Sequence, residues 1–237
     1  MPLDTREIVR IAIEAGQAIM EIYESSEGIE VQTKNDESPL TQADIAAHDT
    51  IVRGLTSIDP LTPIVSEEGR VGNPMDSDAS WLVDPLDGTK EFINRNGQFT
   101  VNIGIIEHGK PVMGVVYAPA INRLFVAEGP DKAWQADVNP GEPVPASDAR
   151  MPLHIRRYPE PGLTAIASKS HRSPETDAFL KKFKVSEIIS AGSSLKFCLL
   201  AAGGNFVLVQ LFLFNKAAST KTRPKDPEAD TARLIAA

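Results

Sequence analysis

Two short apolar segments that each run into a pair of acidic residues constrain this chain more than any other feature. Pro63–Val65 is followed directly by Ser66–Glu68, and Trp81–Val83 is followed by Asp84–Thr89, with the sequence DPLDGT. Short apolar runs that end at turn-forming residues predict buried strands. The ends of strands are where a sheet commonly carries its functional groups. The sequence therefore predicts a sheet that brings several carboxylates together at one end of its strands.

Helical and strand patterns flank these segments on both sides. Apolar residues recur at helical spacing from residue 4 to 23 and from 41 to 58, and Asp4 and Thr41 are suitable caps. The apolar face of the second helix is expected to contain Ile45, Ile51, Val52 and Leu55. Strands are predicted at 31–33, 63–65, 81–83, 100–106, 112–117, 124–126, 164–167 and 185–190, and further helices at 174–183 and 193–202. This order predicts a layered α/β sandwich.

We expect two subdomains that meet near residue 150, within a poorly periodic segment rich in Pro and Ala. Residues 1–150 are predicted to form an N-terminal α+β subdomain with the metal and phosphate site, and residues 151–203 a C-terminal α/β subdomain. Residues 204–237 form an atypical tail. Its apolar run Phe206–Phe214 has the pattern of a strand, and the rest is typical of a solvated, partly disordered extension.

Composition limits the partners and the compartment. The formal net charge is −8 and the isoelectric point is about 5.1, which argues against a nucleic-acid polymer as the main ligand. Cys198 is the single cysteine, so a reducing compartment without disulfides is expected. No apolar run is long enough for a membrane span, and no signal peptide pattern is present. We expect a cytoplasmic protein, with peripheral association with the inner face of the cell membrane as an alternative.

The carboxylates at the predicted strand ends indicate a divalent cation. Alone, Asp44 fits the first turn of a helix. Glu67 with Glu68 fits a solvated turn, and Asp84–Asp87 fits a type I turn. Together, however, four or five carboxylates cannot all stay ionised side by side without a cation, and Mg²⁺ prefers such oxygen ligands. The four histidines are scattered, which argues against zinc, and there is no phosphate loop or dinucleotide fingerprint. Of the reactions considered, metal-assisted hydrolysis of a phosphate ester is the one that these residues favour.

Three motifs resemble the inositol monophosphatase superfamily, whose members are Mg²⁺-dependent, lithium-sensitive phosphatases. The motifs are Lys34–Asp44 (KNDESPLTQAD), Glu67–Glu68 and Asp84–Thr89. The longer run Trp81–Ile105, together with Ala167–Arg172 and Gly192–Cys198, is similar to the CysQ-type 3′(2′),5′-bisphosphate nucleotidases in particular. The resemblance extends from about residue 5 to about residue 203. It implies the layered α-β-α-β-α sandwich of the inositol monophosphatase and sugar phosphatase type.

The resemblance also implies a metal site and a catalytic pair. Four residues match the metal ligands of the family: Glu67, Asp84, the backbone carbonyl of Leu86, and Asp87. Asp84 is expected to bridge two ions. Thr89 and Glu67 match the pair that orients and activates the attacking water, and Asp44 matches an outer carboxylate that helps to hold a further metal ion or its water. The implied cofactor is Mg²⁺ at two or three sites, with the two catalytic ions about 4 Å apart.

A small phosphorylated substrate is the implied partner. The backbone N–H groups of Gly88 and Thr89 are expected to bind phosphate. Ser193 and Lys196 match positions where the family contacts the nucleotide, and their simpler interpretation is a helix cap and a surface lysine. The implied reaction converts adenosine 3′,5′-bisphosphate to AMP and phosphate, which recycles a by-product of sulfate assimilation. The alternatives are an inositol-phosphate or sugar-phosphate phosphatase, and a non-catalytic relative that binds metal or phosphate.

After Gly203 the sequence departs from the family's pattern. The family has an acidic-aromatic strand and then Trp-Asp-x-Ala-Ala-Gly, whose Asp binds the second metal ion. The two tryptophans of this chain are Trp81 and Trp134, and residues 228–232 (EADTA) resemble the motif only faintly around Asp230. The second metal site therefore lacks its expected third carboxylate, and we expect impaired activity.

Overall fold

A computed structural model shows that the chain forms two compact units. It describes residues 4–25, 31–33, 39–154, 162–168, 174–203 and 206–208. By their contacts, residues 1–153 and 193–195 belong to the first unit, and residues 154–192 and 196–237 belong to the second. The roles predicted for the subdomains 1–150 and 151–203 and for the tail stay predictions. Parts of two family motifs (34–38 and 169–172), most of the tail, and Asp230 lie outside the described residues.

The first unit contains an eight-stranded sheet with the strand order β10-β9-β8-β7-β6-β5-β3-β4. Its strands are β3 (Ile64–Ser66), β4 (Gly69–Val71), β5 (Ala79–Asp87), β6 (Thr100–Glu107), β7 (Lys110–Ala118), β8 (Arg123–Ala127), β9 (Ala133–Asp137) and β10 (Met151–Pro152). Strands β1 (Val31–Thr33) and β2 (Pro39–Thr41) form a separate antiparallel pair. β3 and β5 run parallel, with Ser66 paired with Val83. Glu67 and Asp84 therefore follow paired positions on neighbouring strands.

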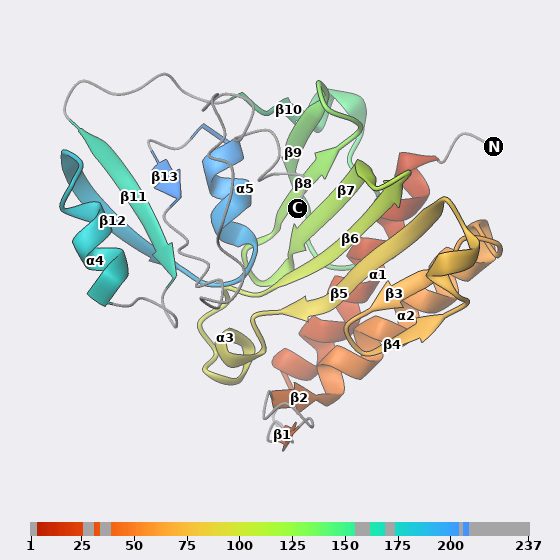
Figure 1. Ribbon diagram of the computed structural model, residues 1–237. Helices are drawn as coiled ribbons and strands as arrows, with labels where there is room; N and C mark the ends of the chain where they lie inside the picture. The colour runs from red at the N-terminus through yellow and green to blue at the C-terminus, as the bar shows by residue number, and fades with distance from the viewer. Residues whose placement is uncertain are drawn as a thin grey trace. The chain divides into compact units, whose positions relative to one another are not determined.

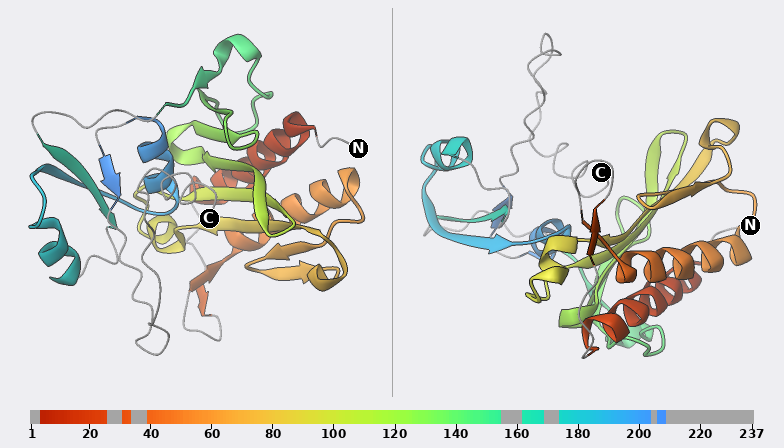
Figure 2. Two further views of the ribbon diagram at one scale, coloured as in Figure 1. Left: turned by 45° about the horizontal axis from the view of Figure 1, so that its top comes forward. Right: turned by 90° about the horizontal axis from the view of Figure 1, so that it is seen from below.

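Two long helices lie side by side against one face of this sheet (Figures 1 and 2). They are α1 (Thr5–Tyr23) and α2 (Gln42–Ile58). α1 begins at Asp4, whose side chain accepts a hydrogen bond from the Arg6 N–H at 2.9 Å. α2 begins at Thr41 with a capping box formed with Asp44. Both starts follow from local sequence, because a short polar side chain satisfies the free N–H groups of the first turn.

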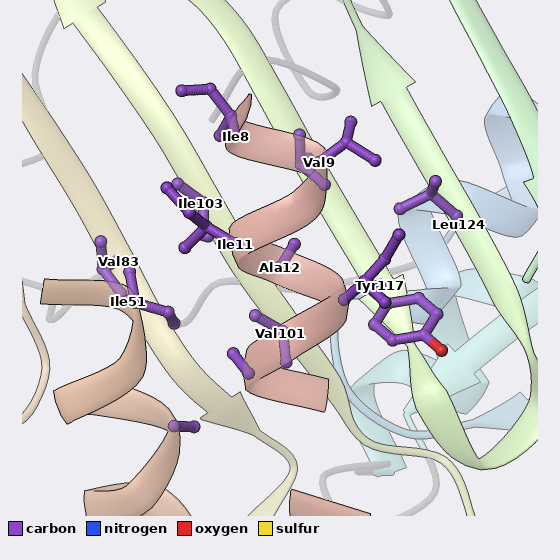
Figure 3. Packing of buried hydrophobic residues seen from close by; sticks show 14 of the residues in the cluster. Ile8, Val9, Ile11, Ala12, Ile51, Val83, Val101, Ile103, Tyr117 and Leu124 are labelled. Carbon is purple, nitrogen blue, oxygen red and sulfur yellow. The ribbon is translucent and has the colours of Figure 1, made fainter. Parts of the chain in front are cut away.

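The core of the first unit lies between these helices and the sheet. Figure 3 shows Ile11 and Ala12 of α1, with Ile51 of α2, packed against Ile103 and Tyr117 of the strands. Burying an aliphatic or aromatic side chain of this size contributes about 1.5–3 kcal/mol. α1 approaches β7 closely at Gly16, where a Cβ atom would lie 2.3 Å from the Tyr117 ring. This packing covers the face of the sheet that the two helices contact.

The second unit contains a three-stranded parallel sheet with the order β12-β11-β13. Its elements are β11 (Leu163–Ser168), α4 (Pro174–Leu180), β12 (Val185–Ala191) and β13 (Phe206–Leu208). Leu180 packs with Ala165 and Val185 in a small core. β13 covers the first three residues of the predicted strand Phe206–Phe214. α5 (Leu195–Ala201) begins in the first unit at Leu195 and continues in the second.

The structure corrects three local predictions. Ile45 was expected on the apolar face of α2, but the residue is 43% exposed. The segment around the predicted boundary contains a regular strand, β9, and the short 3₁₀ helix η3 (Ser147–Ala149). The helix α3 (Thr89–Ile93) and the 3₁₀ helices η1 (Pro74–Asp76) and η2 (Pro119–Ile121) were not predicted. These elements are too short for a clear sequence period.

No helix in the described part of the chain is both long and apolar enough to cross a membrane. The described residues offer no observation in favour of the predicted peripheral membrane association, which stays a prediction.

Candidate active site

A bulge in β5 positions the two aspartates of the DPLDGT motif. Asp84 and Asp87 pair with Asn102 and Thr100 of β6, so two residues of β5 lie opposite a single residue of β6. One of the two is Pro85, which has no N–H to donate and is tolerated inside a sheet at such a bulge. A bulge redirects the side chains beside it. The segment is therefore the end of a strand and not the simple type I turn that its residues also permit.

Gly88 connects this bulge to α3. Its φ is 94°, in the left-handed region. A Cβ atom there would lie 3.1 Å from the Gln98 carbonyl oxygen and 3.2 Å from the Ser193 Cβ. Glycine tolerates both the left-handed φ and the close neighbouring atoms because it has no side chain. The chain can therefore turn sharply, which keeps Thr89 beside the carboxylates.

The Asp84 carboxyl group lies where its ionised form is unfavourable. Its Oδ1 atom is buried and has no hydrogen-bond partner. Burial, followed by the negative charges of Asp87 and Glu67, raises the pKa of Asp84 to about 8. A hydrogen bond with Glu67 acts in the same direction, and one with the Leu86 backbone opposes it. The three acidic side chains predicted as metal ligands therefore interact with one another.

Contacts from both β5 and α2 position the segment that carries Glu67. The Glu67 N–H donates to the Val83 carbonyl oxygen at 3.0 Å. Ser66 Oγ lies 2.9 Å from Nδ1 of His48 and accepts a hydrogen bond from the Glu68 N–H at 3.4 Å. Because Ser66 is buried, these contacts fix the direction in which the chain leaves β3.

Thr89 is hydrogen-bonded to the buried Asp44. The Thr89 hydroxyl lies 3.3 Å from Asp44 Oδ1 and 3.4 Å from the Leu86 carbonyl oxygen. Asp44 Oδ2 accepts hydrogen bonds from the Thr41 N–H at 2.8 Å and the Thr41 hydroxyl at 2.6 Å. The capping box of α2 thus fixes a carboxylate that orients Thr89. The predicted pairing of Thr89 with Glu67 stays a prediction.

Sequence reasoning selected Ser193 and missed its neighbour Ser194. Ser193 accepts a hydrogen bond from the Leu195 N–H at 3.2 Å, and its predicted contact with the nucleotide stays a prediction. Ser194 instead donates its N–H to Asp87 Oδ2. The sequence offered no specific signal for this contact, because its donor is a backbone N–H group. Lys196 is buried, at 7% exposure, so it is not a surface lysine.

The acidic cluster suits a hard divalent cation completed by other ligands. Among the described residues, no group of three or more His, Cys, Asp or Glu side chains is arranged to hold a metal ion by itself. Mg²⁺ does not require such a group, because it commonly binds one or two carboxylates together with water and substrate phosphate. A cation bound here would supply a partner for Asp84 Oδ1 and would offset the mutual repulsion of Asp84 with Asp87 and Glu67. The donor set therefore fits the predicted metal.

The raised pKa of Asp84 predicts that the metal-free protein loses stability as the pH rises. Between the ordinary value of 3.8 and the folded value of about 8, the folded state binds the Asp84 proton and the unfolded state does not. This contribution to the free energy of unfolding is complete below pH 4 and is lost as the pH passes through 8. Urea unfolding in EDTA from pH 5 to pH 9 measures it. An Asp84→Asn variant with the same pH dependence as the native chain would contradict the prediction.

The family of the chain follows from comparison with known proteins. Residues 4–211 match the inositol monophosphatase family, and the chain belongs to that family. The predicted mixed α/β fold and the interpretation of the chain as a phosphatase of this family are confirmed. Metal dependence is a general property of the family. Residues 212–237 lie beyond the match.

Several relatives within the family carry the name 3′(2′),5′-bisphosphate nucleotidase. The chain is 44% identical over 200 residues to the 3′(2′),5′-bisphosphate nucleotidase CysQ of Escherichia coli strain K12, a match that covers 83% of this chain and 76% of that protein. The crystal structure of CysQ from Bacteroides thetaiotaomicron is similar with a TM-score of 0.69 and 37% identity, over 83% of this chain and 75% of that one. The crystal structure of the extragenic suppressor protein SuhB from Bartonella henselae is similar with a TM-score of 0.70 and 27% identity, over 90% of this chain and 81% of that one.

Proposed function

We propose that this protein is a Mg²⁺-dependent nucleotidase that hydrolyses the 3′-phosphate of adenosine 3′,5′-bisphosphate to give AMP and inorganic phosphate. The observation that carries the proposal is the 44% identity to a CysQ nucleotidase, over a match that covers most of the chain. The carboxylate cluster of Glu67, Asp84 and Asp87 supports it, because removing a phosphate group at neutral pH requires positive charge beside the phosphate oxygens.

Each side chain of the site has a proposed role. Glu67, Asp84, Asp87 and the Leu86 carbonyl oxygen would hold the metal ions, which supply positive charge to the phosphate and lower the pKa of a nearby water. The Asp84 proton, present at neutral pH because of its raised pKa, would leave when a cation binds. The N–H groups of Gly88 and Thr89 would contact the phosphate oxygens.

Thr89 and Asp44 would orient the attacking water. A hydroxyl group has a single hydrogen, and both neighbours of the Thr89 hydroxyl, Asp44 Oδ1 and the Leu86 carbonyl oxygen, accept hydrogen bonds. The Thr89 hydrogen therefore points toward one of them. The lone pairs of Thr89 Oγ1 are then available to accept a hydrogen bond from water. A water held in this way has a fixed position for in-line attack on phosphorus.

A comparison of two substrates tests the proposal. Phosphate release from adenosine 3′,5′-bisphosphate is expected to be faster than release from inositol 1-phosphate at equal concentration, and lithium is expected to inhibit it. The assay contains Mg²⁺, with EDTA as the control. The reverse preference would favour an inositol-phosphate phosphatase. Metal binding without release from either substrate would favour the non-catalytic relative, which the departure from the family match after residue 211 makes a specific alternative.

A further inference from the structure

We infer that Ser194 is a positioning residue for Asp87, and that its hydroxyl group ties the segment 193–195 to the strand that faces the metal-binding bulge. The inference rests on the proposed role of Asp87 as a metal ligand. Ser194 donates its backbone N–H to Asp87 Oδ2. Hydrogen bonds from neutral donors to a carboxylate are stronger than those between neutral groups, so this contact restricts the rotation of the Asp87 carboxylate.

The direction of the hydrogen bonds at the Ser194 hydroxyl is determined by its neighbours. The hydroxyl donates to Asn102 Oδ1 at 2.8 Å, because an amide oxygen can only accept. Its single hydrogen is thereby used. In the contact between Ser194 Oγ and Thr100 Oγ1, at 2.8 Å, Thr100 must therefore be the donor. The Ser194 hydroxyl therefore accepts a hydrogen bond from Thr100 and donates one to Asn102, which forms a chain of hydrogen bonds with a defined direction.

This chain of hydrogen bonds lies opposite the bulge. Thr100 and Asn102 are the residues of β6 that pair with Asp87 and Asp84, respectively. Thr100 is fully buried, at 0% exposure, so its hydroxyl has no access to bulk water if the contact is lost. The Ser194 hydroxyl therefore fixes the segment 193–195 to the two residues of β6 that pair with the proposed ligands.

The backbone at Ser193 supports the same interpretation. Its φ is 49°, in the left-handed region that a residue other than glycine seldom adopts. Holding a serine there costs free energy, which the contacts of the following residue offset. Because residues 193–195 belong to the first unit while residues on both sides belong to the second, these contacts are made within the unit that holds Asp87.

Metal titration tests the inference without relying on catalysis. Calorimetric titration of Mg²⁺ into the full chain is expected to give a dissociation constant for Ser194→Ala about 10-fold or more above the native value, because loss of a group that orients a metal ligand typically costs 10- to 100-fold. Ser194→Thr keeps the hydroxyl and is expected to bind within about threefold of the native chain. Ser186→Ala is the matched control. It removes a hydroxyl that donates to carbonyl groups in the second unit and should leave the affinity unchanged.

Two further variants separate the possible outcomes. If Ser194→Ala does not fold, Thr100→Val tests the inference in its place, because it removes the donor to Ser194 with little change of shape. An unchanged affinity of Thr100→Val for Mg²⁺ would then refute the inference. Asp84→Asn tests the proposed metal site itself. Weakened binding in Asp84→Asn with native affinity in Ser194→Ala would refute the positioning role alone. Equal weakening in Ser194→Ala and Ser194→Thr would also refute it, and no binding by the native chain would refute both proposals.

Discussion

Asp84→Asn is expected to raise the dissociation constant for Mg²⁺ by at least about 100-fold and to abolish most phosphatase activity. Loss of a residue that only orients a ligand costs 10- to 100-fold, and Asp84 is the proposed bridging ligand itself. The substitution keeps the size of the side chain and removes the charge that attracts the cation. Calorimetric titration of Mg²⁺ and phosphate release from adenosine 3′,5′-bisphosphate measure the two effects.

The same substitution is expected to stabilise the metal-free protein at pH 8. Without a cation, the ionised Asp84 is repelled by Asp87 and Glu67 and is partly removed from water, which is why its pKa is raised to about 8. An asparagine is neutral, so it avoids both the charge repulsion and the cost of removing a charge from water. Mg²⁺ should make the native chain the more stable of the two proteins, because it binds and stabilises the native chain more than the variant. Thermal unfolding at pH 8 with EDTA and with Mg²⁺ detects this change of sign.

The control for these experiments removes a charge from the surface. Asp78 is 86% exposed, and Asp78→Asn makes the same change of carboxyl group to amide as Asp84→Asn does. It should leave metal affinity and turnover unchanged, because an exposed charge is screened by salt. Equal affinities for Mg²⁺ in the native chain and Asp84→Asn would remove Asp84 from the metal site.

The features that the sequence predicted well are those determined by local contacts. The start of α1 at Asp4 and the capping box of Thr41 and Asp44 depend on residues within one turn of each other. The parallel neighbours β3 and β5 were recognisable as short apolar runs, although their pairing could not be derived from spacing. The acidic cluster followed from the identity of the residues at the strand ends.

The features that the sequence did not predict depend on contacts between distant residues. The bulge between Asp84 and Asp87 is defined by the register with β6, which no local pattern reports. Ser194 meets Asp87 across a separation of 107 residues. The donor is the backbone N–H of Ser194, a group that every residue except proline has, so the side-chain pattern of the sequence does not single it out. Burial of Lys196 is likewise a result of tertiary packing.

Thr89→Val is expected to reduce kcat about 10²-fold, the cost of misplacing a reacting group. Valine has nearly the shape of threonine but offers no lone pair to water and no hydrogen to Asp44. The affinity for Mg²⁺ should stay close to the native value, since Thr89 is not a proposed ligand. Thr89→Ser keeps the hydroxyl and should retain most of the turnover. Single-turnover phosphate release and metal titration distinguish the two variants.

A second substitution shows whether Thr89 acts through Asp44. Asp44 Oδ2 accepts hydrogen bonds from the Thr41 N–H and the Thr41 hydroxyl, and Oδ1 faces the Thr89 hydroxyl. Asp44→Asn therefore places its N–H₂ group either against the Thr41 N–H or beside the Thr89 hydroxyl. If the two residues orient one water together, Asp44→Asn combined with Thr89→Val should lose little more turnover than Thr89→Val alone. Multiplicative losses would mean that they act independently. If Thr89→Val instead weakens Mg²⁺ binding as much as turnover, the contribution of Thr89 is its contact with the Leu86 carbonyl oxygen, and the water must be oriented by another group.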